Sequence, residues 1–310
     1  MSKYKIKKEF FPFSHFTPPI SERFLAMAVP HMKVPRFLSR DREPQVRRYE
    51  VASFDGERIE CFLLSPKNIG QNAPCLIYIH GGGFVLPAAG YHYRNAMQYA
   101  KEASCKVWFV NYRLAPKHPH PIFFEDCYAA MCHLYDNAAA YGIDRLRIGI
   151  GGDSAGSALS VGVCMMARER SHPIRFAFQM LPYPFLDARN DSASAKRFTD
   201  TPMWNSTLSH RIGPMTKVLR DHPSYFWYSP VEASDFQGLP PAYIETCEFD
   251  CLHDDGILYA EKLREAGIHV TLNETEGTMH GFDIVQKAPT TRAAIAARIA
   301  FMKEQFSGEK

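Results

Sequence analysis

Short apolar runs alternate along the chain with longer segments in which apolar residues recur every three or four positions. The short runs predict buried strands, and the longer periodic segments predict helices with one buried face. The predicted strands cover residues 75–79, 106–111, 146–150, 176–181, 242–247 and 269–273, and the predicted helices lie near 92–103, 123–139, 155–170, 253–266 and 290–305. This alternation predicts an α/β fold in which a mostly parallel sheet has helices on both faces.

An antiparallel hairpin is predicted ahead of the first of these strands. Residues 47–54 and 58–64 have the composition of strands, and the Asp55-Gly56 pair between them is a turn sequence. The hairpin brings the predicted sheet to eight strands.

Two stretches do not follow the strand–helix rhythm. Residues 1–45 are rich in proline and aromatic residues, with one short helix predicted around 21–29, and residues 185–235 contain Trp204 and Trp227, two of the three tryptophans. We expect both stretches to pack over the sheet as a cap. The predicted organisation is therefore an N-terminal cap segment at 1–45 and an α/β domain at 46–310, with a cap insertion at about 185–235.

The composition is that of an ordinary globular protein, with 46% hydrophobic and 22% charged residues and a net charge of +3. The basic residues near the N-terminus form one short cluster that does not alternate with aromatic side chains, which does not favour nucleic-acid binding. No stretch approaches the roughly 18 apolar residues that a membrane span requires. We therefore expect neither a nucleic-acid partner nor a membrane span.

Eight cysteines are scattered through apolar surroundings. Their spacing lacks the paired ligands of a zinc site, and disulfide frameworks are typical of short secreted chains. Prolines and charged residues interrupt the N-terminal region where a signal peptide would need an apolar core. The sequence therefore predicts free thiols in a cytoplasmic protein without a metal or other cofactor.

The clearest chemical signal is the sequence Gly152-Asp153-Ser154-Ala155-Gly156. It follows a predicted strand directly and opens a predicted helix, which is the context of a nucleophilic serine on a sharp strand-to-helix turn. Flanking glycines leave room for such a turn, and the adjacent helix N-terminus favours developing negative charge. The alternative is a plain glycine-rich turn with no chemistry.

A second glycine-rich loop, His80-Gly81-Gly82-Gly83, follows the strand predicted at 75–79. Its backbone N–H groups, together with that of Ala155, can form an oxyanion hole for an acyl-transfer reaction. A phosphate-binding loop is the alternative, but the lysine and Ser/Thr of a P-loop are missing and Leu86 breaks the G-x-G-x-x-G spacing.

A reactive serine also needs a base and an acid. Among the thirteen histidines, His280 is best placed, between the last predicted strand and the last helix. Asp250 follows the strand predicted at 242–247, whereas Asp254 lies at a predicted helix start, where a capping role is the simpler interpretation. The chain order Ser154, Asp250, His280 is that of α/β-hydrolases.

With these motifs, the chain resembles the hormone-sensitive-lipase-type esterases, the branch of the α/β-hydrolases that has an HGGG loop and a GDSAG elbow. The resemblance implies an α/β-hydrolase catalytic domain at 46–310 and a helical cap built from the N-terminal segment and the insertion. It assigns the catalytic roles to Ser154, Asp250 and His280 and the oxyanion donors to Gly82, Gly83 and Ala155. The motifs that carry it over roughly residues 75–285 also include Asn111-Tyr112-Arg113-Leu114-Ala115-Pro116, Glu125-Asp126-Cys127, Ser229-Pro230, Gly238-Leu239-Pro240-Pro241, Asp250-x-Leu252-x-Asp254 and His280-Gly281-Phe282.

Two positions depart from the family pattern. Cys251 replaces the proline common after the acid, and Asn111 replaces the aspartate common before Tyr-Arg-Leu. Neither change removes a catalytic group, but the cap resembles nothing specific, so the motifs do not identify the substrate.

The predicted function is that of a serine carboxylesterase acting on short-chain acyl esters, with a small-molecule ester as its partner. Two alternatives remain open at this point. One is a ligand-binding protein on a hydrolase scaffold without turnover, and the other is the same triad acting on an amide or transferring the acyl group to an alcohol. The resemblance also makes a homodimer, paired near the last strand, a possible assembly.

Overall fold

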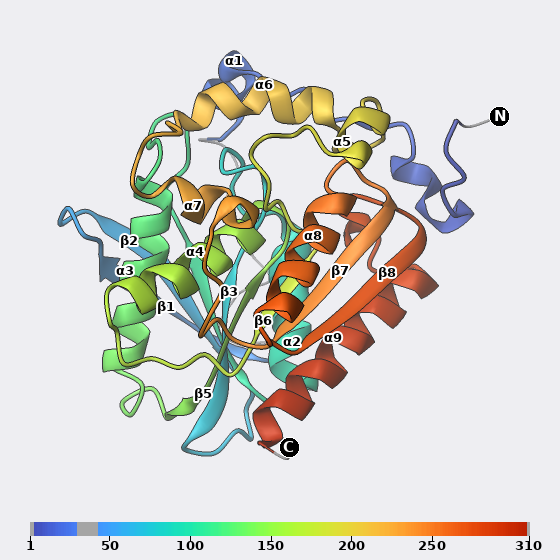
Figure 1. Ribbon diagram of the computed structural model, residues 1–310. Helices are drawn as coiled ribbons and strands as arrows, with labels where there is room; N and C mark the ends of the chain where they lie inside the picture. Colours follow the sequence, from blue (N-terminus) through green and yellow to red (C-terminus); the bar gives the residue numbers. More distant parts are fainter. Residues whose placement is uncertain (1–2, 30–42, 309–310) are drawn as a thin grey trace.

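The computed structural model describes residues 3–29 and 43–308 (Figure 1). Eight strands form one sheet in the order β1-β2-β4-β3-β5-β6-β7-β8. β2 is antiparallel to both β1 and β4, and all the other neighbours are parallel. The strands are β1 (Gln45–Ala52), β2 (Arg58–Ser65), β3 (Ala73–Ile79), β4 (Lys106–Asn111), β5 (Ile143–Gly152), β6 (Gln179–Pro182), β7 (Ala242–Phe249) and β8 (Val270–Met279).

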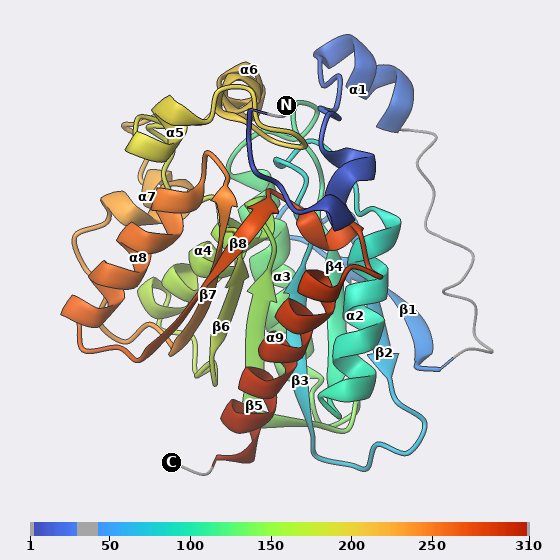
Figure 2. The same ribbon diagram turned by 90° about the vertical axis from the view of Figure 1, so that its right-hand side faces the viewer.

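Helices cover both faces of the sheet, as Figure 2 shows. α2 (Gly90–Glu102) and α9 (Pro289–Ser307) lie on one face, and α3 (Ile122–Asp136), α4 (Ala155–Glu169) and α8 (His253–Glu265) lie on the other. Successive residues of a strand pack into the hydrophobic cores on opposite faces of the sheet. Trp108 of β4 packs toward α3 and α4, while its neighbour Phe109 packs toward α2. The predicted α/β fold, with a mostly parallel eight-stranded sheet flanked by helices, is confirmed.

The structure shifts the bounds of most predicted strands, and three of the changes have a clear cause or consequence. The hairpin turn is longer than the Asp55-Gly56 pair, because Ser53 leaves β1 and donates from its hydroxyl to Asp126 at 2.5 Å. β6 begins at Gln179, three residues later than predicted. β8 extends to Met279, which pairs with Phe249 at the end of β7. Its polar residues conceal the strand in the sequence, but an edge strand accommodates them because part of it faces solvent.

Residues 3–29 and the first part of the insertion lie beyond the carboxyl ends of the parallel strands (Figures 1 and 2). The predicted N-terminal helix is α1 (Glu22–Ala28), capped by the Ser21 hydroxyl, and residues 30–42 of the predicted cap segment lie outside the described residues. The insertion and the segment meet where the Met203 N–H donates to the Phe16 carbonyl at 2.5 Å. The remaining elements of the segment and the insertion are η1 (Lys8–Phe13), α5 (Ala193–Arg197), α6 (Ser206–Thr216), α7 (Tyr225–Tyr228) and η4 (Pro230–Glu232).

A buried ion pair fixes the loop that follows β4. Asp126 of α3 is fully buried and accepts from the Arg113 backbone N–H at 2.9 Å and from its guanidinium at 2.7 Å. Arg113 reaches on to Asp55 in the hairpin loop at 2.7 Å. A buried carboxylate is tolerated only when its hydrogen bonds are satisfied in this way. The same loop supports the HGGG segment, since the Ala115 N–H donates to the Phe84 carbonyl at 2.9 Å.

Two further features concern the chain as a whole. All eight cysteines are unpaired, and seven of them are buried, Cys132 being half-buried. In the described ranges, no helix combines the length and the apolar character needed to cross a bilayer.

His120 joins the loop after β4 to the insertion and makes the stability of this contact depend on pH. Its N–H donates to the Thr216 carbonyl at 2.9 Å, and its ring lies 3.3 Å from the Ser224 hydroxyl. Burial, reinforced by the neighbouring His222, lowers the pKa of His120 to about 4. In the unfolded chain this histidine takes up a proton near pH 6.5. The contribution of neutral His120 to the free energy of unfolding is therefore fully present above that pH and is lost as the pH falls toward about 4.

We expect His120→Gln to flatten the pH dependence of unfolding between pH 6.5 and 4. One buried neutral histidine changes the free energy of unfolding by up to ~1.4 kcal/mol per pH unit in this window. Urea unfolding at several pH values measures the slope. His269→Gln, at an exposed position before β8, serves as the control and should keep the slope of the unmodified protein. An unchanged slope in His120→Gln would contradict the assignment.

Candidate active site

Ser154 occupies the turn between β5 and α4. Its backbone has φ 55° and ψ −119°, a conformation that residues other than glycine rarely adopt. Hydrogen bonds hold the turn on both sides: the Ser154 N–H donates to the Pro182 carbonyl at 3.0 Å, and its carbonyl accepts from the Phe185 N–H at 3.2 Å. The end of β6 thus fixes the serine backbone.

The glycines on either side of this turn are required by its approach to β3. A Cβ atom on Gly152 would lie 2.0 Å from the Ile79 carbonyl oxygen, and one on Gly156 would lie 2.1 Å from the same atom. Both distances are far below a van der Waals contact, and the obstacle is backbone. Any side chain at either position would therefore push the turn away from the end of β3.

The structure brings Ser154 together with the predicted histidine and aspartate, which come from the ends of two other strands. The Ser154 Oγ lies 2.8 Å from His280 Nε2, and His280 Nδ1 lies 2.7 Å from Asp250 Oδ2. A carboxylate only accepts, so Nδ1 donates to Asp250 and Nε2 accepts from the serine. All three side chains are buried. The arrangement can remove the serine proton as the oxygen attacks an electrophile.

The neighbouring carboxylates are engaged elsewhere. Asp254 accepts from the Ser194 N–H at 2.8 Å and contacts His253. The predicted cap is wrong, because Asp254 lies within the first turn of α8 and the N-cap position is Leu252, with no side-chain cap bond. Asp255 accepts two backbone N–H bonds, from Leu186 and Asp187, each at 3.0 Å. Asp250 is in turn oriented by the Leu252 N–H, which donates to its second oxygen at 3.0 Å.

The HGGG loop borders the serine on the β3 side. Gly82 and Gly83 have φ values of 111° and 61°, in the region that favours glycine. A Cβ atom on Gly83 would lie 2.5 Å from the Trp204 ring. Within residues 3–29 and 43–308, the N–H groups of Gly82, Gly83 and Ala155 have no acceptor from the protein. These three donors are available to an oxyanion.

A buried carboxylate that the sequence analysis left without a role connects this loop to the serine turn. Asp153 accepts from the Tyr78 hydroxyl at 2.7 Å and lies 3.1 Å from His92 Nε2. Burial opposes its ionisation, but the His92 imidazole and the Tyr78 hydroxyl hold the pKa of Asp153 below its usual range. A Cβ atom on Gly81 would lie 2.5 Å from Asp153, so the two segments are in tight contact. In the sequence, only the position of Asp153 inside the GDSAG motif indicates that this residue has a role.

His80, at the start of the loop, is also structural. Burial, with a further contribution from His92, lowers the pKa of His80 to about 3, so the ring stays neutral. Its Nδ1 donates to the Gly81 carbonyl at 2.7 Å. The Tyr112 hydroxyl donates to the His80 carbonyl at 3.0 Å. The conformation of the HGGG loop is therefore supported by the loop that follows β4.

A small cavity of about 20 Å³ lies next to Ser154. Trp204, from the insertion, forms part of its wall, and the tryptophan ring centroid is 5.8 Å from that of His280. The Trp204 ring is fixed by a 2.8 Å bond from its Nε1 to the Ser209 hydroxyl. The lining is mostly apolar and consists of Gly83, Phe84, Ser154, Ala155, Phe185, Trp204, Ser209, Ile212, Gly213, Tyr228 and Leu252.

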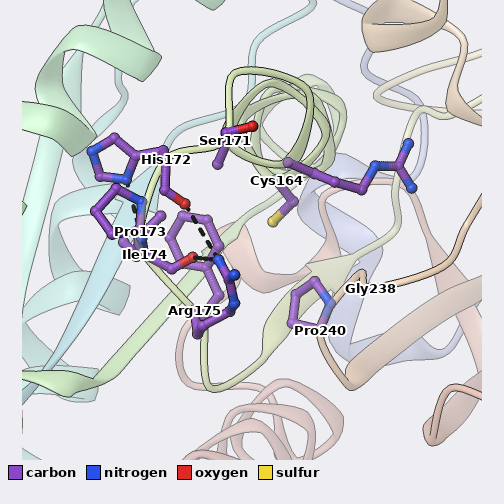
Figure 3. Close-up of a pocket in the computed structure, with 11 residues that line it drawn as sticks. Cys164, Ser171, His172, Pro173, Ile174, Arg175, Gly238 and Pro240 are labelled. Atoms are coloured by element: carbon purple, nitrogen blue, oxygen red, sulfur yellow. Dashed lines mark hydrogen bonds between the residues drawn. The ribbon is translucent and has the colours of Figure 1, made fainter.

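A larger cavity, of about 370 Å³, lies elsewhere (Figure 3). It is lined by Cys164 and Arg168 near the C-terminal end of α4 and by His172 and Arg175 in the loop that follows. At about 1.5 Å per helical residue, these α4 positions are roughly 15–20 Å from Ser154. The Arg175 guanidinium donates to the carbonyls of His172 and Ile174, as the dashed lines show. The residues around this cavity have no part in the serine site.

The described residues contain no group of three or more histidine, cysteine or acidic side chains arranged to hold a metal ion.

Comparison with known proteins identifies the family. Residues 76–284 match the model of an α/β-hydrolase fold family. A carboxylesterase of Mycobacterium tuberculosis, NlhH, is 34% identical over 244 residues, covering 77% of this chain and 76% of the relative. An arylesterase of Saccharolobus solfataricus is 28% identical and covers 91% of this chain and 88% of its own length. Arylacetamide deacetylase of Bos taurus is 29% identical over 66% of this chain and 67% of its own length.

Solved structures agree with the sequence comparisons. A bacterial heroin esterase superposes with a TM-score of 0.87 at 30% identity, covering 97% of this chain and 98% of its own. A hyperthermophilic esterase from the archaeon Pyrobaculum calidifontis gives a TM-score of 0.80 at 29% identity, over 85% and 86% of the two chains. The resemblance predicted from the HGGG and GDSAG motifs is confirmed: the chain belongs to the α/β-hydrolase fold family and is a carboxylic ester hydrolase of the hormone-sensitive-lipase type.

Proposed function

We propose that the protein hydrolyses short-chain acyl esters through an acyl-enzyme on Ser154, with His280 as general base and Asp250 orienting the histidine. The observation that supports this most directly is the continuous chain of contacts, 2.8 Å from Ser154 to His280 and 2.7 Å from His280 to Asp250. Both contacts are within the reach that proton transfer requires.

In the first half of the reaction, the Ser154 Oγ attacks the ester carbonyl carbon while His280 Nε2 takes the serine proton. The tetrahedral intermediate then collapses, the bond to the alkoxy oxygen breaks, and His280 returns the proton to the departing alcohol. In the second half, His280 removes a proton from water, the hydroxide attacks the acyl carbon, and the acid leaves as the Ser154 oxygen recovers a proton. Asp250 stabilises the imidazolium that forms in both halves.

The oxyanion of each intermediate would be held by the N–H groups of Gly82, Gly83 and Ala155. Their lack of a protein acceptor supports this role, because a donor already in use would need to break a bond first. Ala155 also opens α4, so the positive end of the helix dipole faces the developing charge. One such donor is typically worth about 10²- to 10³-fold in rate.

The short-chain preference is supported by the shape of the small cavity. Its volume of about 20 Å³ is room for about one water molecule, and aromatic rings from Phe84, Phe185 and Tyr228 form part of the lining. So narrow a space favours the shortest acyl groups, because the wall must move further for each methylene that a longer chain adds.

An amide bond is the second substrate class for the same residues. One relative is an arylacetamide deacetylase, and this name describes removal of an acetyl group from an amide. The triad accepts either bond, since only the leaving group differs.

A homodimer and a cytoplasmic location stay as predictions from the sequence. β8 is the terminal strand of the sheet and offers an edge to a second copy. Sedimentation of the purified protein would test the homodimer.

The first test replaces the nucleophile. Ser154→Ala should lower kcat by at least about 10⁴-fold on p-nitrophenyl esters, because the acyl-enzyme can no longer form. The unmodified protein should be most active on the shortest members of a series from acetate to palmitate. Matching circular dichroism spectra and melting temperatures serve as the folding control. Stoichiometric ester binding without turnover in the unmodified protein would favour the ligand-binding alternative instead.

The second test separates the two aspartates. Asp250→Asn should lower kcat about 10³- to 10⁴-fold with little change in KM, because the amide no longer selects the productive histidine tautomer. Asp254→Asn is the matched control, four residues away, and should retain kcat within about 10-fold. Steady-state kinetics on the best ester compares them. A larger loss of activity in Asp254→Asn than in Asp250→Asn would reverse the assignment.

The third test enlarges the cavity. Trp204→Ala should raise the ratio of kcat/KM for octanoate over acetate by about 10-fold or more, since each additional buried methylene contributes about 0.8 kcal/mol. Taking the ratio cancels any loss common to both esters. Trp227→Ala removes the other tryptophan of the insertion, which does not line the cavity, and should leave the ratio unchanged. A similar ratio in both variants would reject Trp204 as a determinant of chain length.

A further inference from the structure

An arginine and two carboxylates are buried together behind the histidine of the site. Arg298, in the middle of α9, is fully buried and donates to Glu245 at 2.5 Å and to Asp283 at 2.8 Å. It also donates to the Tyr99 hydroxyl at 3.0 Å. We refer to Arg298, Glu245 and Asp283 as the Arg298 cluster. It connects β7, the segment after β8 and α9 in the interior of the molecule.

Asp283 connects this cluster to the segment that carries His280. It lies three residues after the histidine, in η5 (Phe282–Ile284), and is fully buried. Its Oδ2 accepts from the Asn95 side chain at 3.1 Å as well as from Arg298. The Gln286 side chain donates to the Asp283 carbonyl at 2.7 Å. The chain on the C-terminal side of His280 is therefore held by α2 and α9 together.

Tyr183 completes the connection to the imidazole. Its hydroxyl donates to Asp283 Oδ1 at 2.6 Å, and its ring meets the His280 ring edge to face, with centroids 5.0 Å apart and planes at 67°. The residue follows β6 directly, next to Pro182, whose carbonyl accepts from the Ser154 N–H. Tyr183 thus lies between the backbone support of the serine and the ring of the histidine.

The backbone of Tyr183 is held in an unfavourable conformation for this purpose. Its φ of 36° lies in the left-handed region, which a tyrosine seldom adopts without external support. The support comes from its N–H, which donates to the Glu245 carbonyl at 2.5 Å, and from the hydroxyl bond to Asp283. The Arg298 cluster therefore contacts both ends of this residue.

The protonation states of these groups keep the contacts constant. Burial opposes the charge of Arg298, but the carboxylates around it keep the pKa of the guanidinium well above its usual value. Burial, reinforced by the nearby Asp283 carboxylate, raises the pKa of Tyr183 well above its usual value, so its hydroxyl remains a donor. Buried ionic groups cost desolvation free energy, and one attested use of such groups is to specify a single arrangement of the elements they join.

We propose that Tyr183 and Asp283, anchored by Arg298, are positioning residues that hold the His280 imidazole against Ser154 and Asp250. This inference rests on the proposed role of His280 as the base. The residues do not touch the reacting atoms; they limit the movement of the ring. Small displacements of a catalytic group are costly, since a shift of about 1 Å can lower the rate about 10²-fold.

Tyr183→Phe tests the proposal, because it removes the hydroxyl bond to Asp283 and keeps the aromatic ring beside His280. We expect kcat on p-nitrophenyl acetate to fall about 10-fold or more, with KM within about 2-fold of the unmodified protein. The matched control is Tyr259→Phe, which removes a hydroxyl bond of an equally buried tyrosine, 3.1 Å from Gln179, on the opposite face of the sheet. Its kcat should stay within about 2-fold, at a similar melting temperature.

A double-mutant cycle separates positioning through Asp283 from a general loss of packing. Asp283→Asn should lower kcat, and adding Tyr183→Phe should lower it by less than about 2-fold more, because the two residues act through one contact. Losses that multiply in the double variant would overturn the proposal, as would an unchanged kcat in folded Tyr183→Phe. Loss of turnover in Ser154→Ala together with full kcat in Tyr183→Phe rejects this inference alone, whereas full turnover in Ser154→Ala overturns both this inference and the proposed mechanism.

Discussion

The close approach of the β5–α4 turn to the end of β3 is the constraint on which the rest of the site depends. The carbonyl oxygen of Ile79 leaves no room for a Cβ atom at Gly152 or Gly156, with distances of 2.0 and 2.1 Å. This approach places Ser154 beside the HGGG loop that continues from β3. It also puts the Ala155 N–H next to the loop that contains Gly82 and Gly83. Ser154 and the three backbone N–H groups are therefore brought together by one backbone contact.

Much of this site could be predicted from the sequence, because its signals are local. The spacing of glycines around Ser154, the position of His280 after the last strand and that of Asp250 after the previous one all follow from the rule that parallel strands end at one edge. The helices between the strands were predicted from the apolar period along the chain, whereas the order of the strands in the sheet was not. The length of β8 was not, since the polar residues at its end give no strand signal until the pairing with β7 is known.

The parts that could not be predicted depend on side chains that meet across long separations. Trp204 contacts the space above Gly83, more than a hundred residues earlier in the chain, and no period in the insertion indicates this. The pairing of Arg298 with Glu245 and Asp283 has the same character, because a charged residue in the middle of a helix usually predicts a solvent-exposed face. Asp153 was visible within its motif, but its partners, Tyr78 and His92, come from β3 and α2.

The groups at the strand ends and the wall of the cavity come from different stretches of the chain, and this affects how the protein can change over evolutionary time. The groups proposed to perform chemistry follow β3, β5, β7 and β8, whereas much of the cavity wall, including Trp204, Ile212 and Tyr228, comes from the insertion between β6 and β7. Substitutions in the insertion can alter which molecules enter without disturbing the strand ends. The range of substrates can thus change through substitutions in the insertion, while selection for turnover acts on the residues at the strand ends.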